Sequence, residues 1–108
     1  MGGRGSSTVN LNVTNRFSNL TRDQHYERHG AEFHAKSAID YEELAAKFVS
    51  RKNEPSVDSF VSRDGFTFMY EKISNTFLIH KQSGELVTFF RPTSANYWIM
   101  QRIKYGTP

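Results

Sequence analysis

The chain has 108 residues, which is the size of one small domain. Hydrophobic residues make up 37% of it and aromatic residues 14%, enough to fill a small core, so a wholly disordered chain is excluded. Cys is absent, which excludes disulfides, thiol nucleophiles and cysteine metal sites. No run reaches the roughly eighteen apolar residues of a membrane span, and no apolar segment follows the first Met, so neither a span nor a signal peptide is predicted.

The net charge of +3 is unevenly distributed along the chain. Residues 1–22 and residues 86–108 each carry three Lys or Arg and no acidic residue, whereas residues 23–85 carry eight basic and eleven acidic residues. Two basic ends suit a polyanionic partner such as nucleic acid. Ordinary scatter of charge along a small protein is the alternative explanation.

Residues 1–16 are predicted to form a flexible tail, and residues 17–108 a single domain. The opening is rich in Gly and Ser, and the polar stretch after it has only Val9, Leu11 and Val13 in alternation. Thr21 and Gln24 have the spacing of a capping box, with Leu20 placed as the first half of a hydrophobic staple. A helix is therefore expected from about Arg22 to His29, ending at Gly30.

A second helix is predicted to begin at Ser37, with Asp40 three residues later, and to stop near Arg51, before Pro55. Apolar side chains recur at helical spacing along it, and polar ones are expected on its solvent side. The apolar stripe is Tyr41, Leu44, Ala45 and Phe48, and the solvent side holds Glu42, Glu43 and Lys47.

From Val57 onward the apolar period changes from that of a helix to that of a strand. Aromatic and β-branched runs at 66–71, 77–80 and 86–91 are separated by turn residues, with 57–62 a weaker first strand and Pro92 closing the last run. Residues 94–105 fit a helix or a strand equally well. Helices followed by strands indicate an α+β fold, with two N-terminal helices packed on a three- to four-stranded antiparallel meander.

The sequence HYERHG, residues 25–30, gathers the first candidate functional side chains. His25 and His29 share one helix face with Arg28 beside it, which offers an acid, a base and a phosphate ligand. Lys36 either extends this basic region or belongs to a polar loop between the two helices. An ordinary solvated helix face is the alternative. A metal site is disfavoured, because Tyr26 stands where the zinc-protease pattern needs Glu, and only Glu32, His34 or His80 are available as further ligands.

A second group of candidate residues lies at the end of the last predicted strand. Thr88 and Arg91 are followed by Tyr97 and Trp98, so a hydroxyl, a guanidinium and two aromatic rings come together in the sequence. Such groups can position a phosphodiester and stack a base. Core packing is the alternative, above all for Phe89, Phe90 and Trp98. His80 is expected to have a structural role or to lie on the surface.

The order of these motifs resembles the barnase, EndoU, colicin and RelE-like (BECR) nuclease superfamily, over about Leu20 to Trp98. The motifs are an H-x-x-R-H-G helix, a Y-x-x-L-A-x-x-F helix, an aromatic meander, V-T-F-F-R-P and a final Y-W. Such domains occur as toxins of contact-dependent inhibition systems and in phage-encoded proteins. One departure is Arg28, where related toxins commonly have Lys.

This resemblance implies an endoribonuclease without metal or cofactor, directed at tRNA and working by attack of the ribose 2′-OH. It further implies RNA and an immunity protein as partners, no membrane partner, a monomeric state and a location in the cytoplasm of a host or target cell. The implied catalytic residues are His25, Arg28, His29, Thr88 and Tyr97, and the substrate-binding residues are Arg91, Trp98, Lys36, Arg102 and Lys104. The alternatives are a nucleic-acid-binding module that does not cleave and a phage-encoded inhibitor of a host protein.

Overall fold

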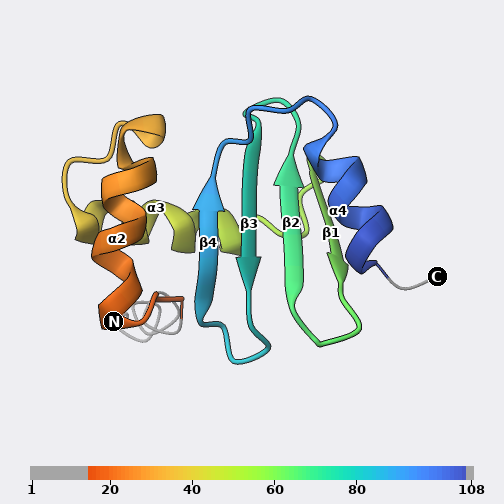
Figure 1. Ribbon diagram of the computed structural model, residues 1–108, viewed down its shortest axis with the longest axis horizontal. Helices are drawn as coiled ribbons and strands as arrows, with labels where there is room; N and C mark the ends of the chain where they lie inside the picture. Colours follow the sequence, from red (N-terminus) through yellow and green to blue (C-terminus); the bar gives the residue numbers. More distant parts are fainter. Residues whose placement is uncertain (1–14, 107–108) are drawn as a thin grey trace, which may run out of the picture.

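A computed structural model describes residues 15–106 and confirms the α+β fold (Figure 1). The tail predicted for residues 1–16 lies outside the described residues, apart from Asn15 and Arg16. In the described part, the sheet has the strand order β1-β2-β3-β4, and every neighbouring pair is antiparallel. The elements are α2 (Asn19–His29), the 3-10 helix η1 (Gly30–Phe33), α3 (Ala38–Ser50), β1 (Val57–Val61), β2 (Thr67–Glu71), β3 (Thr76–His80), β4 (Leu86–Phe90) and α4 (Tyr97–Tyr105).

The start of α2 differs from the prediction. Ser18 is the N-cap, and its side chain accepts a hydrogen bond from the main-chain N of Thr21, so the helix begins at Asn19 and not near Arg22. Leu20 is 84% exposed and forms no staple. Phe17 is buried instead and stacks on Tyr41 at 5.7 Å between ring centroids. Burial of Phe17 fixes the chain just before the helix, which makes Ser18 the first residue able to cap it.

Helix α3 forms where the sequence predicts it. The Ser37 hydroxyl caps the helix by accepting from the main-chain N of Asp40 at 3.0 Å, and the helix ends at Ser50. The prediction that Glu42 faces solvent is wrong, because this side chain is buried. Its Oε2 accepts a hydrogen bond from the main-chain N of Phe17 at 2.9 Å, so a partner offsets the cost of burying the carboxylate.

The meander is as predicted, including the weaker first strand. Left-handed backbone at Gly65 (φ 87°), Asn75 (φ 52°) and Gly84 (φ 97°) makes the three tight connections, one in each predicted turn. Asn15 Nδ2 donates to the Gly84 carbonyl at 3.1 Å, which places the first described residue against the β3–β4 turn.

The two faces of the sheet support two separate cores. On one face, α2 and α3 bury Tyr41, Met69 and Phe89, among others. The ambiguous residues 94–105 form helix α4 from Tyr97, and Trp98 of this helix packs with Phe68 and Phe77 in the core on the other face. Figure 1 shows α3 behind the sheet, α2 beside β4, and α4 beside β1 and β2. None of the helices between residues 15 and 106 is long and apolar enough to cross a membrane.

Candidate active site

His25 and His29 lie one turn apart on α2, next to the edge strand β4. Their ring centroids are 6.4 Å apart. The His29 ring stacks on Phe90 of β4 at 5.2 Å, and the His25 ring stacks on Phe17 at 4.8 Å. The structure therefore places His29 against the last strand, with His25 one helical turn before it.

A carboxylate orients His29. Nδ1 of His29 lies 2.7 Å from Oε2 of Glu32, and Oε1 of Glu32 accepts a hydrogen bond from the main-chain N of Arg91 at 2.7 Å. Since Nδ1 donates to the carboxylate, Nε2 is the nitrogen left to exchange a proton with another molecule. Both carboxylate oxygens of Glu32 are hydrogen-bonded, so the imidazole of His29 has a defined orientation.

The surroundings of His25 disfavour its protonated form. Its Nδ1 is buried and has no hydrogen-bond partner among residues 15–106. Burial lowers the pKa of His25 below its ordinary value, and the charges of His29 and Arg28 lower this pKa further. Protonation of His25 would leave a buried N–H without an acceptor, so this ring is suited to donating a hydrogen bond and not to gaining a proton.

Thr88, Phe90 and Tyr97 lie on the sheet face opposite α3. Thr88 and Phe90 are two residues apart on β4 and point to the same side, where Phe90 contacts Tyr97 at 5.5 Å between ring centroids. Burial raises the pKa of Tyr97 above its ordinary value, so its phenol keeps its proton at neutral pH. Phe90 therefore contacts the rings of both His29 and Tyr97.

Arg91 points to the other side of the sheet. Its Nε donates to the Glu32 carbonyl at 2.9 Å, and its guanidinium lies over the Phe33 ring at 4.6 Å. Trp98 is buried, and its ring stacks on Tyr70 at 5.5 Å. In this structure Arg91 fixes Glu32 and Trp98 fills a core.

The remaining predicted residues are spread around the molecule. Arg28 is exposed on α2, and Lys36 is exposed just before α3. Arg102 lies over Phe60 of β1 at 5.6 Å, in the last turn of α4 together with Lys104. This turn is on the β1 side of the sheet, away from α2 (Figure 1), so the two basic residues of α4 do not join the histidine pair.

Within the part of the chain that the structure describes, no group of three or more His, Asp or Glu side chains could hold a metal ion. Glu32 is engaged by His29 and Arg91, and His80 lies opposite Thr67 on the α3 side of the sheet.

Sequence reasoning missed the role of Glu32 and the stacking of Phe90. The signal for Glu32 was its spacing of three residues from His29, which brings two side chains together where a helix continues into a 3-10 turn. Phe90 carried no such signal, since its contact with His29 depends on how α2 packs beside β4.

No protein-family model matches the chain, and a search of curated proteins finds no match. Among solved structures, a ribonuclease from Escherichia coli complexed with its inhibitor protein is similar. That similarity covers 81% of this chain and 99% of the ribonuclease, with a TM-score of 0.51 and 14% sequence identity. The chain therefore has a ribonuclease-like α+β fold.

Proposed function

We propose that this protein is a metal-independent endoribonuclease that cleaves RNA by attack of the ribose 2′-OH on the adjacent phosphorus. The observation that carries the proposal is the histidine pair beside β4, in which Glu32 orients His29 and burial lowers the pKa of His25. The ribonuclease-like fold supports it.

In this mechanism His29 is the general base. Its Nε2 accepts the proton of the 2′-OH while its Nδ1–H stays on Glu32, and the new bond from the 2′-oxygen to phosphorus expels the 5′-oxygen. The phenol of Tyr97 supplies the proton that the 5′-oxygen needs. The products are a 2′,3′-cyclic phosphate and a free 5′-hydroxyl, so the nucleophile belongs to the RNA.

The remaining groups stabilise the charge that develops on the phosphate oxygens. His25 donates a hydrogen bond from its outer nitrogen, Arg28 supplies positive charge beside it, and the Thr88 hydroxyl donates from the strand. Exposed Lys36 extends the positive surface toward a longer RNA strand, for which tRNA is the proposed substrate.

An inhibitor protein of the immunity type is proposed as a further partner. The similar ribonuclease is complexed with such a protein. A nuclease that acts on the RNA of its own cell needs a means of being held inactive, which gives this partner a purpose.

The test is cleavage of total tRNA in EDTA by the wild type, His29→Ala and His80→Gln. The wild type and His80→Gln should give the same discrete fragments with cyclic phosphate ends, because His80 lies beside Leu86, at the opposite end of β4 from the Phe90 ring that contacts His29. His29→Ala should cleave at least about 10²-fold more slowly. Intact tRNA with the wild type would overturn the proposal, and a native gel of the same samples would then separate an RNA-binding module from an inhibitor that binds a host protein.

A further inference from the structure

A pocket of about 370 Å³ lies on the α3 side of the sheet, the face opposite to that of the Phe90 side chain. It is formed by α3, η1 and the ends of strands β2 to β4 that lie nearest them. The rings of Phe33, Phe48 and Phe89 line it, and Lys47 and Arg91 are among its charged residues. This volume and this mixture of apolar and a few polar groups are typical of sites for small molecules.

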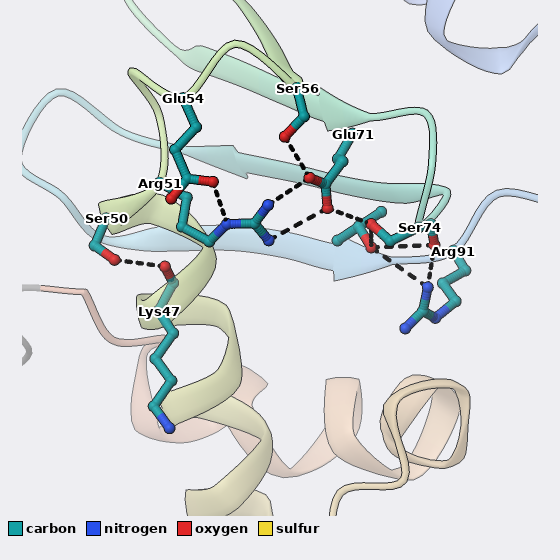
Figure 2. A network of polar contacts seen from close by, with 9 residues as sticks. Lys47, Ser50, Arg51, Glu54, Ser56, Glu71, Ser74 and Arg91 are labelled. Carbon is teal, nitrogen blue, oxygen red and sulfur yellow. Dashed lines mark hydrogen bonds and ion pairs between the residues drawn. The ribbon is translucent and has the colours of Figure 1, made fainter.

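The carboxylate that lines this pocket, Glu71, is fully engaged. Figure 2 shows both of its oxygens bound by the Arg51 guanidinium and by two hydroxyls, those of Ser56 and Ser74. These hydrogen bonds, with that from Arg51 the strongest, lower the pKa of Glu71 to about 2. Glu71 therefore neutralises Arg51 and leaves the positive charge of the other lining residues in place.

Two cations of the pocket have no carboxylate partner among the described residues. Within residues 15–106, the Arg91 side chain donates only to the carbonyls of Glu32 and Ser74 and, at 3.5 Å, to the Thr76 hydroxyl, through Nε and Nη1. Nη2 of Arg91 makes no hydrogen bond to any of residues 15–106. In Figure 2 it makes none to the residues drawn. Lys47 is exposed and forms no ion pair in the same part of the chain.

We propose that this pocket binds a small organic phosphate, with the phosphate held by Lys47 and Arg91 and an apolar or aromatic body against Phe33 and Phe48. Charge-assisted hydrogen bonds favour an anion at the two cations, and burial of apolar surface favours an organic body over a bare ion. The inference does not rest on RNA cleavage. Its link to the proposed active site is Arg91, whose main-chain N also holds Glu32.

The test is a titration of the isotope-labelled full chain with adenosine 5′-monophosphate, followed by amide chemical shifts. Saturable shifts are expected at Phe33, Lys47 and Thr76. Lys47→Gln should weaken binding about tenfold, the scale of one lost charge-assisted hydrogen bond. The matched control Lys52→Gln, also exposed and just beyond α3, should bind as the wild type does.

The same titration in His29→Ala separates this pocket from the proposed active site, and there the shifts should be unchanged. Adenosine and inorganic phosphate, titrated separately, should each bind more weakly than the nucleotide. The proposal is overturned if the shifts appear only around His25 and His29, or if Lys52→Gln weakens binding as much as Lys47→Gln. It is equally overturned if adenosine or phosphate alone binds as tightly as the nucleotide.

Discussion

Nδ1 of His29 lies 2.7 Å from a carboxylate oxygen of Glu32, and this contact is anchored from the far end of the chain. The other oxygen of Glu32 accepts from the main-chain N of Arg91, 59 residues later. The end of β4 therefore sets the orientation of a histidine on α2. The proposed base is positioned by the packing of the helix against the sheet edge, not by the helix alone.

Glu32→Gln should lower the rate constant of RNA cleavage while leaving RNA binding nearly unchanged. Gln keeps the shape of the side chain but loses the charge that stabilises a protonated His29, and we expect a loss of about 10- to 100-fold, the scale seen when a group orienting a functional histidine is removed. Steady-state kinetics on tRNA would measure kcat and KM separately. Glu27→Gln, an exposed change on α2, is the control, and equal kinetics for the two variants would contradict the positioning role.

Glu71→Gln should destabilise the fold near neutral pH by about 2 kcal/mol, because its hydrogen bonds to Arg51 and two hydroxyls lose their charge. The pKa of Glu71 is lowered from 4.5 to about 2 in the folded protein, so its stabilisation is present above about pH 4.5 and is lost as the pH falls toward 2. Urea unfolding from pH 7 to pH 2 should show the free energies of the wild type and the variant converging. A constant difference across this range would contradict the assignment, and Glu43→Gln serves as an exposed control on α3.

The parts of the fold that local chemistry specifies were predictable from the sequence. Ser37 caps α3 through its own neighbours, and Gly65 and Gly84 make their turns by backbone conformation alone. The start of α2 was not predictable in this way, since it depends on Phe17 reaching Tyr41. Helix α4 was ambiguous for the same reason, because contacts of Trp98 with strands β1 to β3 decide its state.

In the candidate site too, local spacing predicts some features, whereas others depend on contacts between distant residues. The pairing of His25 with His29 follows from helical spacing, and the structure shows the two rings stacked. The role of Glu32 depends on a hydrogen bond from Arg91 that no local pattern indicates. The direction of the Arg91 side chain also could not be read from the sequence, because its side of the strand is fixed only when Phe89 enters the core under α3.

Trp98→Ala should cost about 3–5 kcal/mol in the free energy of unfolding, because the ring fills the core between α4 and the sheet. The milder Trp98→Phe should keep a folded protein whose affinity for tRNA equals that of the wild type. Denaturant unfolding and fluorescence anisotropy with labelled tRNA would measure the two effects. A folded Trp98→Phe protein with lost RNA affinity would show instead that the indole contacts substrate.

His25 should make the stability of the protein depend on pH near neutrality. Its pKa is lowered in the folded state from the ordinary 6.5, so between the folded and unfolded pKa values the unfolded chain binds more protons. The contribution of His25 is therefore fully present above about pH 6.5 and is lost as the pH falls below it.

His25→Phe keeps an aromatic ring against Phe17 and removes the titrating group, so the variant should lose less stability than the wild type between pH 8 and pH 5. His34→Asn is the matched control, because His34 is exposed and Asn tolerates its left-handed backbone (φ 56°). Unfolding free energies at the two pH values give the result, and an unchanged pH dependence in His25→Phe would mean that the buried Nδ1 of His25 does not oppose protonation.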